Sequence, residues 1–300
     1  MTKSAYLAGL LLYASITAAQ QQDFSNVEVE VQHVGGNVQM LTGAGGNIGL
    51  SVGPDGVLVV DDQYAPLVPR IRAAIATVTR QPVRYVLNTH WHPDHVGGNA
   101  EFSKDATLVA HDNVRRRLAE GHPGILGRPV PPAQAEALPV ITFDQSLTFH
   151  FNGEPIRALH FPRGHTDGDV IVFFPASNVV HMGDTFVTYG LPFVDVASGG
   201  SLLGMIEGVE KAMAAVPDDV KVIPGHGPVS SKADVLAFVA MLRDCVRLVG
   251  LAMKNGQTLQ QMQEAGVLAK YDHLGKGFVK TASFVEVIYN ELRGGAQPPG

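Results

Sequence analysis

Three histidines and one aspartate occur within residues 90–95, in the pattern H-x-H-x-D-H. Side chains two positions apart in an extended segment point the same way, so His90 and His92 can bind one ion. The proline that follows bends the backbone and carries Asp94 and His95 toward a second point nearby. Four such groups are costly to bury without partners. The pattern therefore predicts two metal ions side by side rather than a histidine-rich surface loop.

Three further segments supply the additional ligands that two neighbouring ions need. Each places one histidine or aspartate after a predicted strand or in a tight turn, where open α/β sheets place their sites. These side chains are His165 in GHTDGD, Asp184 in MGDT and His226 in PGHGP. The seven other histidines lack this framing and are predicted to be packing or surface residues: His33, His111, His122, His150, His160, His181 and His273.

Cys245 is the only cysteine of the chain, which excludes an internal disulfide and a thiolate zinc cage. The metal ligands must therefore be histidines and carboxylates. Cys245 lies in a helical pattern at core spacing, so we expect it to pack in the core.

The composition favours an enzyme that acts on a small molecule. With 300 residues, of which 45% are hydrophobic, the chain can bury a full core, and we expect residues 20–300 to form a single domain. The formal net charge is −6 and there is no long run of lysine and arginine, which argues against a nucleic-acid partner. The oligomeric state stays open.

Residues 1–19 match a signal peptide. Lys3 precedes an apolar run over residues 5–14, and small residues stand before Gln20. The run is short for a membrane span, and no later segment approaches that length. We therefore predict cleavage and a periplasmic or secreted mature protein without a membrane span.

The elements that must position the ligands form two β-rich halves. Residues 27–60 are predicted to form four short antiparallel strands separated by glycine turns, and helices and strands then alternate. The Pro/Gly-rich residues 121–139 are predicted to form a loop that could wall the site. The predicted strands are 27–32, 38–42, 48–52, 57–60, 83–88, 107–110, 146–151, 156–161, 170–174, 179–181 and 220–223. The predicted helices are 66–79, one from about residue 97, 112–120, 201–215, 231–254, 258–264 and 281–292.

The order and spacing of these ligands resemble the metallo-β-lactamase superfamily over roughly residues 25–230. The resemblance implies an α+β fold, a four-layer αβ/βα sandwich with the site at the edge between two β-sheets. It also implies the distribution of the ligands. One zinc ion would be bound by His90, His92 and His165, a second by Asp94, His95 and His226, and Asp184 would bridge the two.

Two departures bear on the substrate. The commonest subclass of true β-lactamases has a cysteine where this chain has Asp184, and a lysine for the antibiotic's carboxylate where this chain has Val187. A bridging aspartate is instead similar to glyoxalase II, lactonases and phosphodiesterases. Together with the leader, the motif most resembles the exported hydrolases of that set. β-Lactamase activity is therefore not established by the resemblance.

The expected reaction is hydrolysis by a hydroxide that bridges two zinc ions. Asp94, as ligand and proton acceptor, would orient the hydroxide and later pass on its proton. The expected substrate carries a small ester-, lactone-, thioester- or β-lactam-like bond. Histidine and carboxylate ligands also suit iron and manganese.

Three alternatives stay open from the residues alone. The first is an oxidoreductase like persulfide dioxygenase, with one iron bound by His90, His165 and Asp184. The second is a nuclease of the same superfamily, which the acidity and the leader disfavour. The third is a binding protein with an inactive site, for which a complete ligand set would have no purpose.

Overall fold

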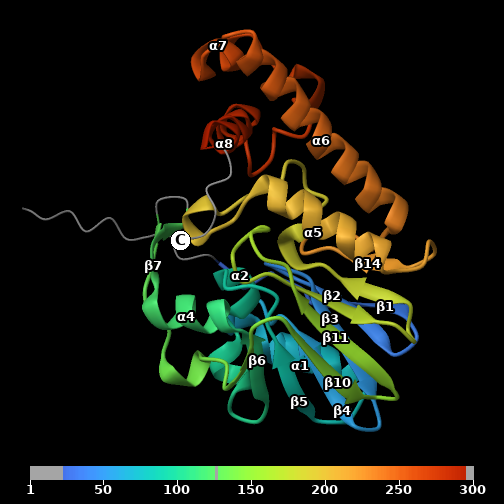
Figure 1. Cartoon of the computed structure of the whole chain (residues 1–300). Helices are drawn as coiled ribbons and strands as arrows, with labels where there is room; N and C mark the ends of the chain where they lie inside the picture. The colour runs from blue at the N-terminus through green and yellow to red at the C-terminus, as the bar shows by residue number, and fades with distance from the viewer. Residues whose placement is uncertain (1–22, 126–127, 295–300) are drawn as a thin grey trace, which may run out of the picture.

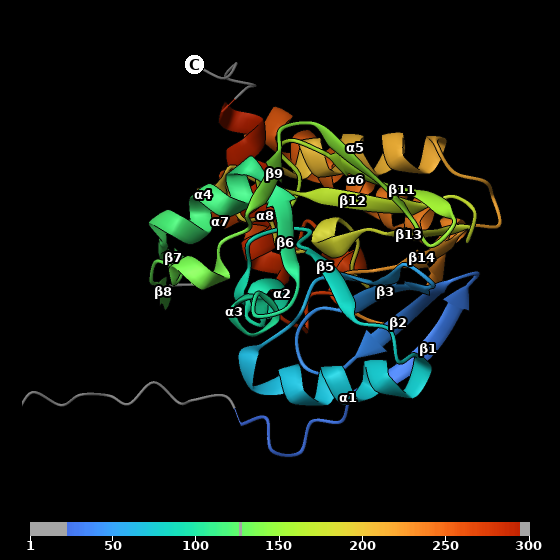
Figure 2. The same cartoon turned by 90° about the horizontal axis from the view of Figure 1, so that it is seen from below.

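Two β-sheets stack face to face, with helices on both outer sides, in the computed structural model (Figures 1 and 2). The structure describes residues 23–125 and 128–294. The predicted signal peptide, residues 1–19, lies outside the described residues. Its cleavage stays a prediction that the mass of the exported protein can test.

The first sheet has seven strands in the order β1-β2-β3-β4-β5-β6-β9. Strands β1 to β4 form the predicted antiparallel meander, whereas β4, β5, β6 and β9 run parallel. Their carboxyl ends therefore meet at one edge. The strands are β1 (Glu30–Gly35), β2 (Val38–Thr42), β3 (Ile48–Gly53), β4 (Gly56–Val60), β5 (Val83–Leu87), β6 (Thr107–His111) and β9 (Ile141–Phe143).

The second sheet has six strands in the order β10-β11-β12-β13-β14-β15. Only the pair of β13 and β14 is parallel within this sheet, so both of these strands also end at one edge. The strands are β10 (Ser146–Phe151), β11 (Glu154–His160), β12 (Val170–Phe174), β13 (Val179–His181), β14 (Lys221–Ile223) and β15 (Ser230–Ser231).

Helices complete the four layers. Helix α1 packs on the outer face of the first sheet through Ile71 and its neighbours at helical spacing. Helices α5 and α6 cover the second sheet, and Leu58 and Phe174 lie in the core between the sheets. These layers confirm the predicted αβ/βα sandwich. The helices are α1 (Val68–Val78), α2 (Pro93–Val96), α3 (Asn99–Phe102), α4 (Asp112–Glu120), α5 (Leu202–Ala214), α6 (Lys232–Lys254), α7 (Leu259–Glu264) and α8 (Thr281–Gly294).

The C-terminal helices extend the core on the side of the second sheet. Phe284 and Ile288 of α8 belong to the same buried cluster as α5 and α6. Cys245 is fully buried in that cluster, which confirms its predicted packing role. Among the described residues, no helix is both long enough and apolar enough to cross a membrane.

One prediction of local structure was wrong, and one short helix was not predicted. The predicted loop 121–139 contains a two-stranded ribbon of β7 (His122–Ile125) and β8 (Arg128–Val130), because these segments pair with each other rather than with a large sheet. Of two short helices, α2 was not predicted, and α3 is the helix predicted from about residue 97. The first begins at Pro93, whose fixed φ suits the first turn of a helix.

Candidate metal centre

His90, His92 and His165 form the first of two groups of predicted ligands. The first two follow β5, and His165 lies between β11 and β12. One ring nitrogen from each lies within 4.8 Å of the others, and His92 Nδ1 is 2.8 Å from His165 Nε2. His90 Nε2 is buried without a hydrogen-bond partner among the described residues. Three imidazoles with an unpartnered nitrogen fit the requirements of a zinc ion.

Asp94, His95 and His226 form the second group. Asp94 and His95 lie on the single turn of α2, and His226 follows β14. His226 Nε2 is 3.3 Å from both Asp94 Oδ2 and His95 Nε2. The side chains of Asp94 and His226 remain 26% and 23% exposed, whereas that of His95 is fully buried. Solvent therefore reaches the centre from the side of the second group.

Asp184 lies between the two groups, on the short helix η3 (Gly183–Thr185) that follows β13. Its Oδ2 atom is 3.7 Å from His165 Nε2 of the first group. Its Oδ1 atom is 3.2 Å from His95 Nε2 and 3.5 Å from His226 Nε2 of the second group. Oδ1 is also buried without a hydrogen-bond partner among the described residues. The fold thus brings all seven predicted ligands together; their binding of metal stays a prediction.

Asp61 is a buried member of the site that was not predicted. It follows β4 directly and accepts hydrogen bonds from the Thr89 amide and hydroxyl, each at 2.7 Å. His95 Nδ1 lies 2.7 Å from Asp61 Oδ2, which leaves His95 Nε2 facing the second group. Asp61, His90 and His95 also satisfy the spacing of a metal-binding group, but both Asp61 oxygens already accept hydrogen bonds. We therefore interpret Asp61 as the residue that orients His95.

The position of Asp61 carried a signal that the sequence analysis did not use. An aspartate directly after a buried apolar strand is the same pattern that identified Asp184. The backbone of Asp61 is left-handed, with φ of 64°, a conformation that non-glycine residues adopt mainly where the surroundings enforce it.

Asp195 orients a second ligand. Its Oδ2 atom is 3.0 Å from His92 Nε2, so His92 presents Nδ1 to the first group. The neighbouring Phe193 carbonyl is 2.7 Å from His165 Nδ1 and holds that ring in the same way. Both residues lie in the irregular segment after Asp184, where no periodic pattern could identify them.

Two glycines provide the space that the ligands occupy. A Cβ atom on Gly46 would lie 2.1 Å from His95 Cε1, and one on Gly225 would lie 2.0 Å from Asp184 Oδ1. Any larger residue would displace these ligands. The close backbone approach therefore fits a site built to hold a compact group of side chains.

His90 and His165 of the first group are electrically neutral at neutral pH. Burial, with the nearby charge of His95, holds the pKa of His90 well below its ordinary value. Burial and the neighbouring His92 lower the pKa of His165 to about 4. Neutral imidazoles have a free lone pair, which is the form that binds metal.

The second group combines protonated histidines with ionised carboxylates. Burial opposes protonation of His226, but the Asp184 carboxylate outweighs it and raises the pKa of His226 to about 9. Burial likewise opposes the charge on His95, yet Asp184 and Asp94 hold its pKa well above the ordinary value. Against the same burial, His95 and His226 lower the pKa of Asp94 to about 2. A dication bound here would replace the two protons as the partner of the carboxylates.

The remaining histidines stay outside both groups in the described part of the chain. His122 lies against Trp91, with ring centroids 5.1 Å apart, and His111 stacks on His160 at 3.6 Å. These contacts agree with the packing role predicted for them.

The comparison with known proteins identifies one family. The Metallo-beta-lactamase superfamily matches residues 41–226, more than half of the chain. Hydroxyacylglutathione hydrolase of Pelagibacter ubique is 25% identical over 146 residues, which cover 48% of this chain and 52% of that protein. Metallo-beta-lactamase type 2 of Bacteroides fragilis is 24% identical over 138 residues, covering 46% of this chain and 51% of that protein. The chain thus spans about half the length of these relatives.

A solved structure shares the fold. The metallo-beta-lactamase from Pontibacter korlensis superposes with a TM-score of 0.60 at 19% sequence identity, covering 72% of this chain and 99% of that one. This likeness supports the sandwich architecture described above.

Proposed function

Because the chain belongs to the metallo-beta-lactamase superfamily, we propose that it is a metal-dependent hydrolase with two zinc ions that share Asp184. In this proposal His90, His92 and His165 bind one ion, and Asp94, His95 and His226 bind the other. The substrate carries a small ester-, lactone-, thioester- or β-lactam-like bond.

The observation that supports two ions is the placement of the Asp184 carboxylate. One oxygen faces His165, and the other faces His95 and His226. A carboxylate can donate to two metals at once, and this one lies between two complete sets of three ligands. His90 Nε2, which is buried without a hydrogen-bond partner among the described residues, supports the presence of a metal ion.

The residues of the chain hold and orient the reacting groups. Bound zinc would lower the pKa of a coordinated water toward neutrality and polarise the substrate's carbonyl oxygen. Asp94 stays ionised at neutral pH and is partly exposed, so it can accept a proton from the attacking water and pass it to the leaving group. Asp61 and Asp195 hold His95 and His92 in the ring orientation that binds metal.

The relatives support an acyl bond as the target. One is named a hydroxyacylglutathione hydrolase and another a metallo-beta-lactamase. Val187 is 2% exposed, and its apolar side chain cannot bind a substrate carboxylate as a lysine would. Antibiotic cleavage is therefore not the favoured activity within this class.

Elemental analysis and a hydrolysis screen test this function together. We expect about two zinc ions per chain, and turnover within a panel of lactams, lactones, thioesters and phosphodiesters that is lost on chelation and restored by zinc. A single iron per chain with oxygen consumption would instead support the dioxygenase-like alternative. Turnover that survives full chelation would remove the metal from the reaction.

The two ligand groups should differ in how their metal occupancy depends on pH. Metal must displace protons from His95 and His226, whereas His90 and His165 are already neutral. Below a pH of about 9, the affinity of the second group for zinc should fall as the pH is lowered, by about tenfold per pH unit for each proton displaced. At fixed free zinc, we expect the metal content to fall from about two per chain at pH 8.5 toward one at pH 6.

Dialysis against buffered zinc, followed by elemental analysis, measures this content. The variant His226→Ala is the matched control, because it should hold about one ion at either pH. Parallel loss of both ions from the wild-type protein as the pH falls would contradict the assignment of the protons to the second group.

A further inference from the structure

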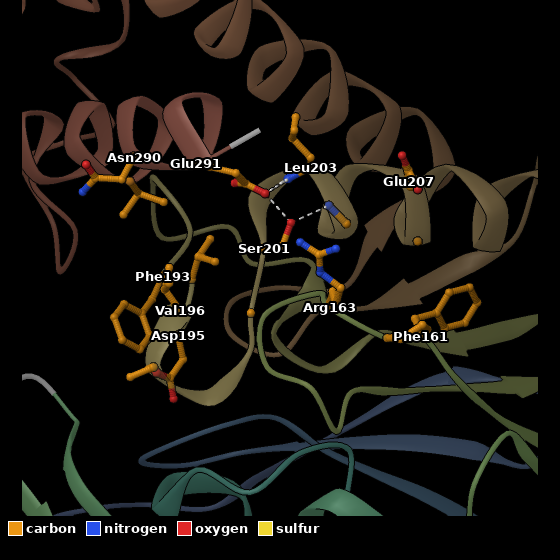
Figure 3. Close-up of a pocket in the computed structure, with 18 of the residues that line it drawn as sticks. Phe161, Arg163, Phe193, Asp195, Val196, Ser201, Leu203, Glu207, Asn290 and Glu291 are labelled. Carbon is orange, nitrogen blue, oxygen red and sulfur yellow. Dashed lines mark hydrogen bonds between the residues drawn. The ribbon is translucent and has the colours of Figure 1, made fainter. Parts of the chain in front are cut away.

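A cavity of about 1180 Å³ lies between the start of α5, helix α8 and the segment that precedes His165 (Figure 3). Small-molecule sites usually have volumes of roughly 300–1,000 Å³, so this cavity could take a large substituent. Its lining includes Phe161, Arg163, Val196, Leu203, Val287 and Asn290.

The cavity and the metal centre share two residues. Phe193 and Asp195 line the cavity, and both also contact the first ligand group. The Phe193 ring centroid lies 6.0 Å from that of His92 and 5.8 Å from that of His165. The cavity therefore adjoins the first ligand group across Phe193 and Asp195.

Exposed apolar side chains gather around this junction. Val196 and Leu203 line the cavity and are 61% and 38% exposed. Closer to the second ligand group, the ring centroids of Tyr189 and His226 are 5.6 Å apart. Phe278 is 58% exposed, and its ring centroid lies 5.8 Å from that of Phe193. Water-exposed apolar side chains grouped around a polar centre are typical of a binding surface.

The charges around the cavity disfavour an anionic ligand. Four carboxylates and two cationic side chains line it: Asp195, Glu207, Glu286, Glu291, Arg163 and Lys211. Glu291 lies at the start of α5, where it accepts hydrogen bonds from the Ser201 hydroxyl and the Leu203 amide (Figure 3). It also accepts a hydrogen bond from the Leu202 amide. These donors are therefore not free for a ligand.

No lysine or arginine of the described residues forms an ion pair with the seven predicted ligands. Among the described residues, the ion pairs of the seven ligands involve only histidines and aspartates. Lys276 and Lys280 flank Phe278 in sequence, and the Lys280 ammonium group donates to the Lys276 carbonyl.

We propose that this cavity binds an extended, uncharged apolar acyl group of the substrate, whose carbonyl carbon lies at the metal centre. This inference rests on the proposed hydrolase function and adds the substrate class, a thioester or ester of an apolar acid. Water adds to the carbonyl, the acyl–sulfur or acyl–oxygen bond breaks, and the products are the acid and a thiol or alcohol.

A chain-length series tests the proposal. The substrates are S-ethyl thioesters of acetic, butanoic, hexanoic and octanoic acid, and the zinc-loaded protein's kcat/KM is measured from the ethanethiol released. Each buried methylene contributes up to about fourfold, so we expect octanoyl to exceed acetyl by at least tenfold. Val196→Glu should lower this ratio at least fivefold, because it places a charge in the cavity at an exposed position. Leu251→Glu, on an exposed position of α6 away from the cavity, is the matched control and should leave the ratio unchanged.

A binding measurement separates this proposal from the hydrolase function. We expect the neutral dye Nile red to bind wild-type protein and to be displaced by 1-octanol, with affinity lost in Val196→Glu and retained in Leu251→Glu. That result without thioester turnover would support the cavity and overturn the hydrolase function for thioesters. The cavity proposal would be overturned by turnover that shows no preference for chain length. It would also be overturned if Val196→Glu left either the octanoyl-to-acetyl ratio or the dye binding unchanged.

Discussion

Replacing Asp184 with asparagine is expected to reduce hydrolysis more than about 100-fold and to lower the metal content of the chain. Loss of a partner outside the ligand set already costs roughly 10–100-fold in affinity or activity, and a shared ligand should cost more. The substitution keeps the side chain's shape but removes the charge that faces His95, His165 and His226.

The same variant should change the protonation of His226. The Asp184 carboxylate is the main cause of the raised pKa of His226, so that pKa should fall when the charge is removed. We would measure turnover, metal content and the His226 titration by NMR. Asp219→Asn, the same change on the surface before β14, is the matched control. Two bound metals with unaltered turnover in Asp184→Asn would contradict a shared carboxylate.

Replacing Asp61 with asparagine should weaken both the metal site and the fold. Asp61 is fully buried and accepts from the Thr89 amide, the Thr89 hydroxyl and His95 Nδ1. The asparagine amide accepts hydrogen bonds only through its oxygen, so its NH2 group would face one of these three donors. We expect about 10–100-fold weaker metal binding and a free energy of unfolding that is lower by roughly 1–3 kcal/mol.

Asparagine is the informative substitution because it tolerates the left-handed backbone of Asp61, so the effect reports the hydrogen bonds and the charge of Asp61 rather than backbone strain. Zinc titration and thermal unfolding, with and without metal, measure the two effects, again with Asp219→Asn as control. Unchanged zinc affinity would mean that Asp61 does not orient His95. A loss of stability that is equally large with and without metal would assign Asp61 to the fold alone.

Much of the fold was predictable because its signals are local. The meander of β1 to β4 has short apolar runs bounded by glycine turns, and α4 was predicted with its observed bounds. The ribbon of β7 and β8 was missed, because pairing between Pro/Gly-rich segments leaves no periodic pattern. Strand β9 was also missed; it is stabilised by its pairing with β6, which lies about thirty positions earlier in the sequence.

The sequence by itself determined which side chains gather at the metal centre. Four of the seven lie in one short motif, and His165, Asp184 and His226 stand at strand ends or tight turns, so the topology of the sheets brings them to one edge. Residue type also restricted the ligands, since a single cysteine cannot form a zinc cage of several thiolates. These are local properties of the chain, which a pattern can reveal.

Only the tertiary structure decided how those side chains are oriented and what adjoins them. His92 meets Asp195 across 103 positions of sequence, and His95 meets Asp61 across 34. Such contacts depend on how sheets and loops pack, and no periodicity encodes them. The cavity beside Phe193 arises in the same way, because its walls come from α5, α8 and the segment before His165. Local composition thus fixes which chemistry is available, whereas the packing of distant segments sets which nitrogen faces the metal and which substrate can reach it.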